Sequence, residues 1–274
     1  MLKLRIISAF ILLPLVITAI LKLPSAYVAV ASGVVFAAGA WEWLSMTGIK
    51  HQALRVVLLL LLILVAYSLL ATGLNVVWVY WLALSWWLLG LVGICYYPNG
   101  KGWWQVIALQ PFIGLIMFVP AWLAFNQLHS TAVTGPQLVL LGCALIWGAD
   151  IAAYFTGKLW GKDKLIEQVS PGKTWAGFYG AVASGCIIMS GYYVLYKPQF
   201  NYIYAIWLGL LVVVFAVIGD LVESLFKRVY GVKDSGKLIP GHGGVFDRID
   251  SMLAAFPVYM LGLQVIQQLR IMDL

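Results

Sequence analysis

Long apolar runs with few or no charges recur along almost the whole of this 274-residue chain. A run of about twenty such residues, rising about 1.5 Å per residue as a helix, can cross the roughly 30 Å hydrocarbon core of a bilayer. Hydrophobic residues make up 63% of the sequence, whereas soluble domains contain about 45–50%. We therefore expect an all-α, polytopic integral membrane protein. The nine predicted spans are 4–21, 26–44, 55–72, 75–95, 103–125, 137–157, 175–196, 202–226 and 245–269.

These spans leave no room for a separate soluble domain, so residues 1–274 are expected to form a single membrane domain. Its N-terminal helical part is residues 1–130, and residues 131–274 form a second part with two polar loops, 158–174 and 227–244. We interpret the first run as a retained helix and not as a cleaved signal peptide, because no small-residue cleavage site follows it promptly.

The basic residues are divided unequally between the two sides that nine spans would create. Of the 17 lysines and arginines, all but Lys22, Lys197 and Arg270 fall on the side of the N-terminus. Because cytoplasmic loops are enriched in Lys and Arg, this pattern predicts a cytoplasmic N-terminus. The net charge of +7 is spread over short loops, which argues against a nucleic-acid partner and favours contact with anionic lipids or phosphates.

All acidic residues except Asp273 also map to the predicted cytoplasmic side. Asp150 and Asp220 lie seven and six residues before their predicted helices end, which is roughly 10 Å below the surface at 1.5 Å per residue. A carboxylate inside a span costs up to about 2.5–3.5 kcal/mol, and such groups usually face the interior of the bundle. A buried ion pair is the simplest alternative, but several acids at one depth favour a functional site.

Three polar stretches of the sequence are expected to meet at the depth of Asp150 and Asp220. The first, "WGADIAAYFTGKLWGKDKL", places Asp150, Tyr154 and Lys158 on one helical face and continues into "SPGKTWAG". In the second, "GDLVESLFKR", residues 220, 223, 224 and 227 form one polar stripe. In the third, "PGHGGVFDRIDS", a glycine-rich turn leads to Asp247 and Asp250, and its free N–H groups can hold an anion.

Carboxylates and cations gathered at a membrane surface are typical of phosphoryl or nucleotidyl transfer. Carboxylates are the ligands that Mg²⁺ prefers, and Lys or Arg offset the charge of phosphate oxygens. Other chemistries lack their motifs: the sequence contains neither GxSxG nor HExxH, and the GKT at residues 172–174 lacks the first glycine of a P-loop. His242 has no second ligand at metal spacing, which argues against zinc.

The run "SLFKRVYGVKDSGKLIPGHGGVFDRID" (224–250) closely resembles the signature of the phosphatidate cytidylyltransferases, the CDP-diacylglycerol synthases. The stretches at 147–165 and 170–177, and "AWEW" at 40–43, also resemble this family, so the similarity spans nearly the whole chain. The resemblance implies Mg²⁺-dependent transfer of CMP from CTP to phosphatidic acid, giving CDP-diacylglycerol and pyrophosphate. It also implies a bacterial inner membrane with the active site facing the cytoplasm.

The resemblance implies that Asp220 and Asp247 bind the metal, and the charge and position of the neighbouring residues suggest roles for them. The expected metal ligands are Asp220, Asp247 and Glu223, with room for a second cation. The expected catalytic residues are Asp220, Asp247, Lys227 and Arg248. The expected substrate-binding residues are Lys173, Arg228, Lys237, His242, Gly243, Gly244, Asp150 and Ser224.

Three alternatives stay open at this point. A sister enzyme could use CTP with another lipid phosphate, since the signature does not exclude a different lipid. An ion-coupled transporter also has many spans with acids in them, although its acids usually lie near the midplane in repeated halves. The small-residue runs "AAGA" and "GAVASG" permit close helix packing, either within one chain or in a homodimer.

Overall fold

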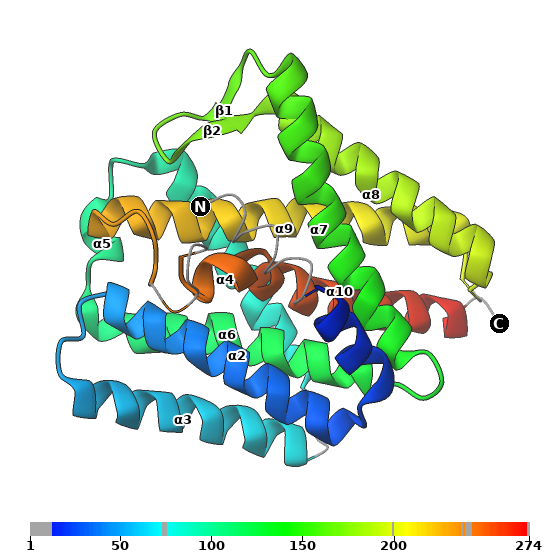
Figure 1. Ribbon diagram of the computed structural model, residues 1–274, viewed down its shortest axis with the longest axis horizontal. Coiled ribbons are helices and arrows are strands. Elements are labelled where there is room, and N and C mark those ends of the chain that lie inside the picture. Colours follow the sequence, from blue (N-terminus) through cyan, green and yellow to red (C-terminus); the bar gives the residue numbers. More distant parts are fainter. Residues whose placement is uncertain (1–12, 73–75, 199, 237, 239–242, 273–274) are drawn as a thin grey trace.

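The computed structural model describes residues 13–72, 76–198, 200–236, 238 and 243–272 (Figure 1). Within these residues, eight helices are long and apolar enough to cross a membrane. This confirms the prediction of an all-α, polytopic membrane protein. The eight are α2 (Ser25–Met46), α3 (Gln52–Ala71), α4 (Val77–Tyr96), α6 (Gln110–His129), α7 (Gly135–Trp160), α8 (Trp175–Tyr196), α9 (Tyr202–Tyr230) and α10 (Phe246–Met272).

The first predicted span, 4–21, is described only from residue 13. A helix covers Leu13–Lys22, and residues 4–12 lie outside the described part of the chain. The fifth predicted span, 103–125, differs from the structure at both ends. Lys101–Trp104 forms the short helix α5, Ile107–Leu109 forms the 3₁₀ turn η1, and α6 begins only at Gln110. Pro111 explains this start, because proline fits the first turn of a helix and lacks the N–H needed inside one.

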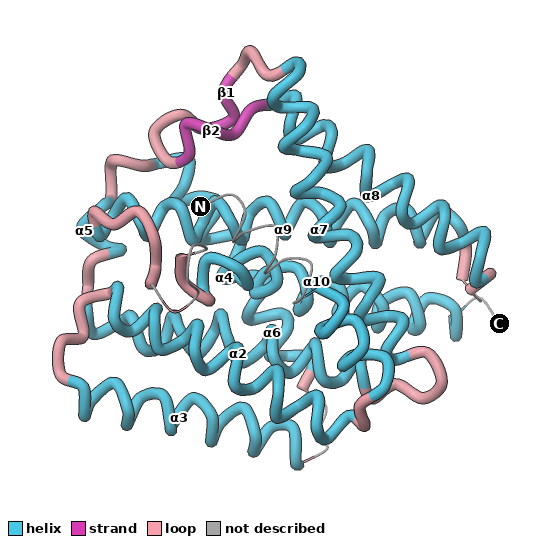
Figure 2. The backbone as a smooth tube through the Cα atoms, viewed as in Figure 1, coloured by secondary structure: helices cyan, strands magenta, loops and turns pink. Residues whose placement is uncertain are grey.

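The polar stretch 158–174, predicted as a loop, contains a small antiparallel hairpin (Figure 2). Strands β1 (Lys164–Ile166) and β2 (Ser170–Thr174) form it. The Thr174 hydroxyl then caps α8 by accepting a hydrogen bond from the Gly177 N–H at 3.1 Å. Because β2 runs directly into a capped helix, the hairpin has a fixed position beside the ends of α7 and α8.

Helix α10 lies inside the bundle and packs against α2, α4, α6, α7 and α9. It therefore contacts helices from both sequence parts, 1–130 and 131–274. Helix α3 is at the opposite extreme, since only Leu62 and Ala66 are buried on it. Its exposed leucines and valines suit contact with lipid chains.

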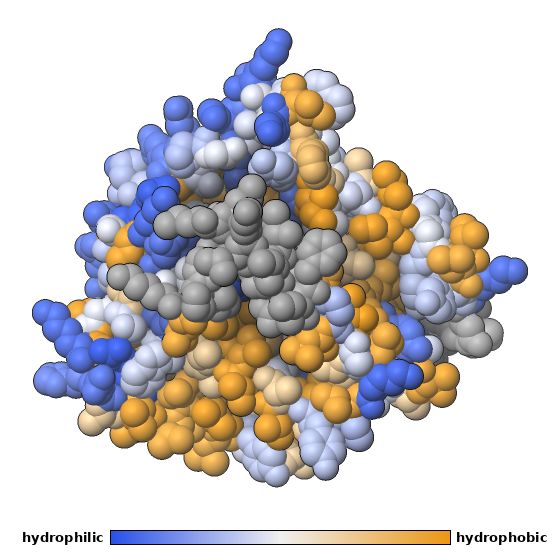
Figure 3. All heavy atoms as spheres, in the orientation of Figure 1, coloured by the Kyte–Doolittle hydropathy of each residue, from blue (hydrophilic) through white to orange (hydrophobic). Residues whose placement is uncertain are grey.

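The surface divides by polarity (Figure 3). Hydrophobic residues cover the side of α2 and α3, and hydrophilic residues gather around the β1–β2 hairpin and the α5 side of the molecule. The polar end of the bundle is therefore the end at which α9 finishes and α10 begins (Figure 1).

Candidate functional site

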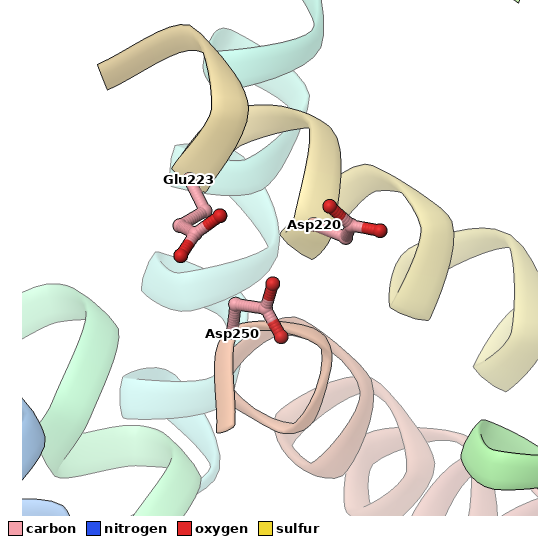
Figure 4. Close-up of side chains that lie close together, drawn as sticks. All are labelled: Asp220, Glu223 and Asp250. Atoms are coloured by element: carbon pink, nitrogen blue, oxygen red, sulfur yellow. The ribbon is translucent and has the colours of Figure 1, made fainter. Parts of the chain in front are cut away.

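Three carboxylates from two helices converge near the polar end of the bundle. Asp220 and Glu223 come from α9 and Asp250 from α10, and one oxygen of each lies within 4.8 Å of the others. Asp220 and Glu223 share a face because they are three residues apart on a helix. Figure 4 shows the three side chains directed toward the space between α9 and α10. Among the described residues, this is the one group of three or more metal-ligating side chains.

Close packing of the two helices brings the carboxylates together. At Gly219, next to Asp220, an added Cβ would lie 2.6 Å from the carbonyl oxygen of Asp250 and 3.1 Å from Cα of Ser251. No side chain other than hydrogen fits there without moving α10. Gly219 therefore sets how closely the acids of α9 approach those of α10.

Two lysines offset part of the negative charge. Lys173, which β2 carries to the site, lies with its Nζ 2.7 Å from Oδ2 of Asp220. Nζ of Lys227 lies 2.5 Å from Oε2 of Glu223 and 3.0 Å from Oδ1 of Asp247. The Glu223 and Asp247 side chains are only 1% and 7% exposed, so Lys227 bridges two buried acids.

Asp247 is held by hydrogen bonds as well as by charge. The Ser235 N–H donates to both of its oxygens, at 3.2 and 3.1 Å, and the Gly244 N–H donates to Oδ2 at 2.8 Å. A carboxylate beside the free N–H groups of a helix N-terminus is in a favourable position. Asp247 therefore ties the segment between α9 and α10 to the first turn of α10.

The other predicted substrate-binding residues are distributed around this centre. Asp150 on α7 is exposed and interacts electrostatically with Asp220, Lys173 and Arg248. Ser224 is half-buried on α9, one residue beyond Glu223.

Arg228 and Arg248 are exposed on α9 and α10. Nε of Arg228 donates to the Val169 carbonyl at 3.1 Å, which links α9 to the hairpin. Gly243 has φ +82°, a left-handed conformation that favours glycine. Lys237 and His242 lie outside the described residues.

The helices extend further beyond the acids than the sequence predicted. Helix α7 ends at Trp160 and α9 at Tyr230, so Asp150 and Asp220 each lie ten residues before a helix end, and not seven and six. At about 1.5 Å per residue this is about 15 Å along each helix axis. The two acids thus lie equally far from the ends of their helices, and that distance is greater than expected.

The three-carboxylate group offers the ligands that a hard cation requires. Its donors are oxygens from two rigid helices, as Mg²⁺ and Ca²⁺ prefer. Oε1 of Glu223 is buried and has no hydrogen-bond partner among the described residues, although buried polar atoms are normally paired. The residues present therefore fit a divalent cation held by Asp220, Glu223 and Asp250.

Asp250 and Glu42 were not among the residues that the sequence nominated for the site. Asp250 had a detectable signal, since it follows Asp247 by three residues and so lies one turn further along α10. Glu42 is separated from the site by nearly 200 residues in sequence. Its position inside an apolar run and in the family-like stretch "AWEW" marked it as unusual, but did not connect it with α10.

The cytidylyltransferase family matches residues 3–266, almost the whole chain. The chain belongs to the cytidylyltransferase family. A cytidylyltransferase of this family from Pseudomonas aeruginosa, named phosphatidate cytidylyltransferase, is 40% identical over 265 residues, which cover 94% of this chain and 96% of the relative.

Two further cytidylyltransferases carry the same name. The protein from Haemophilus influenzae is 36% identical over 281 residues, covering 94% of this chain and 97% of its own. The protein from Bacillus subtilis is 40% identical over 133 residues, which cover 48% of this chain and 49% of its own. The family predicted from the signature at 224–250 is confirmed.

Proposed function

We propose that the chain transfers CMP from CTP to phosphatidic acid, giving CDP-diacylglycerol and pyrophosphate. The observation that carries the proposal is the group formed by Asp220, Glu223 and Asp250, with Lys173 and Lys227 beside it. The chain is similar over nearly its full length to proteins named phosphatidate cytidylyltransferase, and this supports the choice of both substrates.

The reaction needs no nucleophile from the protein. A phosphate oxygen of phosphatidic acid forms a bond to the α-phosphorus of CTP, and the bond from that phosphorus to the oxygen shared with the β-phosphate breaks. Pyrophosphate leaves with the electron pair. The chain therefore has to bind two anionic groups, align them and offset their charge.

Asp220, Glu223 and Asp250 would hold Mg²⁺ at this site. When bound, the cation would offset negative charge on phosphate oxygens during transfer. Asp247, the ligand implied by the family resemblance, already accepts hydrogen bonds from Ser235 and Gly244 and pairs with Lys227. We therefore assign Asp247 to the positioning of Lys227 and the start of α10, and Asp250 to the metal.

The basic residues around the group suit substrate phosphates. Lys173 reaches Asp220 from the hairpin and is half-buried, so its ammonium group lies where a phosphate could replace part of that contact. Arg248 and Arg228 are exposed nearer the end of the bundle. We assign them to the triphosphate, which approaches from water. Lys237 and His242 remain candidates from sequence alone.

A cytoplasmic active site in the bacterial inner membrane fits this assignment. The hairpin lies on the polar side of the molecule (Figure 3), and its Lys173 contacts Asp220. The excess of lysine and arginine in loops of that end favours the cytoplasmic side. CTP is available there, and phosphatidic acid in the inner leaflet could present its headgroup to the same end.

The test is purified protein in mixed micelles with CTP, Mg²⁺ and phosphatidic acid, scored for pyrophosphate and for the CDP-lipid. We expect equal amounts of both products, none without lipid, and much less with ATP, GTP or UTP; dCTP tests recognition of the ribose. An isoprenyl phosphate replaces phosphatidic acid in a parallel reaction. Faster turnover with that lipid would favour the sister activity, and absence of turnover with either lipid would refute the proposal.

A further inference from the structure

Glu42 is a buried carboxylate on α2 that the proposed chemistry does not use. The residue is only 3% exposed. Its Oε2 accepts a hydrogen bond from the Phe246 N–H at 2.9 Å and one from the Ser235 hydroxyl at 3.4 Å. A buried charge in a membrane helix is costly, and such residues usually have a specific function.

The contact with Phe246 lies at the start of α10. Phe246 is the first residue of that helix, and the first four N–H groups of a helix have no partner within it. Glu42 therefore caps α10 from a residue 204 positions earlier in the chain. Negative charge at this end also interacts favourably with the helix dipole. Asp247 and Asp250 follow within the next turn.

Ser235 connects Glu42 to the site from a second direction. Its hydroxyl donates to Glu42, and its backbone N–H donates to Asp247. The same serine is 8% exposed. One short segment after α9 is thus fixed between a carboxylate of α2 and a carboxylate of α10.

Two glycines enclose the Glu42 carboxylate. A Cβ added at Gly236 would overlap with Oε1 of Glu42, and a Cβ added at Gly244 would overlap with Oε2 and with the Ser235 hydroxyl. The backbone at Gly236 and at Gly244 therefore closes directly on this side chain. Such close approach requires residues without a Cβ.

We propose that Glu42 is a positioning residue of the cytidylyltransferase site. It fixes the N-terminus of α10 and the segment at Ser235, and through them the orientation of Asp247 and Asp250. Glu42 itself contacts neither metal nor substrate. The inference rests on the proposed function for its kinetic readout, but its structural readout does not depend on that function.

Two conservative variants distinguish the effect of the length of the Glu42 side chain from the effect of its charge. Glu42→Gln keeps an acceptor oxygen at the same distance from Phe246 and removes the charge. Glu42→Asp keeps the charge but withdraws both oxygens by one methylene. If Glu42 acts by positioning, the Asp variant should lose more activity than the Gln variant; if only negative charge matters, the order is reversed.

We expect Glu42→Asp to lower kcat by about 10²-fold, the usual consequence of misplacing reacting groups by about 1 Å. The Mg²⁺ concentration for half-maximal activity should rise about tenfold, as when residues behind metal ligands are lost. Hydrogen exchange of the backbone amides of residues 243–250 should become faster, because the Phe246 N–H has lost its acceptor.

Asn126→Ala serves as the matched control. Asn126 is also buried, at 5% exposure. Its amide donates to the Trp122 carbonyl at 2.7 Å and to the Ser32 hydroxyl of α2 at 3.4 Å, and among the described residues neither partner forms a hydrogen bond with the acids of α9 and α10. This variant should lose stability without a change in Mg²⁺ dependence or in exchange of residues 243–250.

The inference would be overturned if the backbone amides of residues 243–250 exchanged hydrogen at the wild-type rate in a folded Glu42→Asp protein. A greater loss of activity in Glu42→Gln than in Glu42→Asp would also overturn it. A loss of activity that only follows the loss of folded protein, as in Asn126→Ala, would also overturn it. If the wild-type protein turns over no CTP, the proposed function fails, and the exchange rates still decide whether Glu42 holds α10.

Discussion

Replacing Gly219 by alanine tests whether close packing of α9 and α10 assembles the site. The new Cβ would lie 2.6 Å from the Asp250 carbonyl oxygen and 3.1 Å from both Ser251 Cα and Ala254 Cβ. Favourable contacts between heavy atoms need about 3.5–4.0 Å, so the helices must separate by roughly 1 Å. Asp250 would then move away from Asp220 and Glu223 by a similar amount.

The expected effects on stability and on activity differ in size. Overpacking costs about 1–3 kcal/mol, and exchanging glycine for alanine in a helix returns about 1 kcal/mol. The free energy of unfolding should therefore fall by at most about 2 kcal/mol, and the protein should remain folded. Activity should fall much further, by about 10²-fold, because the reacting groups are misplaced by about 1 Å.

The assay compares pyrophosphate release from CTP and phosphatidic acid with thermal unfolding of the same preparation. Gly191→Ala is the matched control, because a Cβ at Gly191 of α8 meets nothing within 4 Å and should leave activity unchanged. If Gly219→Ala keeps kcat within twofold of wild type, the contact at Gly219 does not set the spacing of the acids and the reasoning is wrong.

Two further predictions concern charge and orientation. Lys227→Met removes the cation that Glu223 and Asp247 share, and their side chains are only 1% and 7% exposed. The free energy of unfolding should therefore fall by about 3–5 kcal/mol. Unchanged thermal unfolding in detergent would show that the ion pairs contribute little. In a variant without native cysteines, Lys233→Cys should react with an impermeant maleimide only after spheroplasts are broken, whereas Lys197→Cys should react in intact ones. The opposite pattern would contradict the proposed cytoplasmic site.

The fold could be predicted in outline because membrane spans obey one strong rule, that backbone polar groups must be satisfied within each helix. Apolar runs of about twenty residues therefore identify spans almost directly. The errors arose where polar residues continue a helix. Trp160 and Tyr230 end α7 and α9, and hydropathy alone stops short of both because Lys158, Lys227 and Arg228 lower it.

The hairpin at 164–174 could not be predicted in the same way. Its strands have three and five residues, too short for an alternating pattern to stand out. Its consequence for the site is large, because β2 carries Lys173 to Asp220. The sequence identified Lys173 through its motif, but its partner became visible only with the hairpin.

The sequence predicted which residues form the candidate site better than it predicted which of them contact one another. Spacing on one helix correctly grouped Asp220, Glu223 and Lys227, because residues three, four and seven apart share a face. Which acids of α10 face that stripe depends on how two helices pack, and Gly219 sets this contact. The contribution of Glu42 depends on contacts between residues about 200 positions apart, for which one sequence carries no signal.

The balance of charge bears on the alternative that these acids form only buried ion pairs. In the described part of α9 and α10, three carboxylates share two ammonium groups: Lys173 of β2 pairs with Asp220, and Lys227 pairs with Glu223 and Asp247. A self-sufficient network would be expected to neutralise itself, because unpaired buried charge is strongly destabilising. Oxygens of Asp220, Glu223 and Asp250 also lie within 4.8 Å of one another, a spacing that suits a divalent cation held between them. The unpartnered Oε1 of Glu223 supplies the missing contact point, so the arrangement favours a cation site over a purely structural ion-pair network.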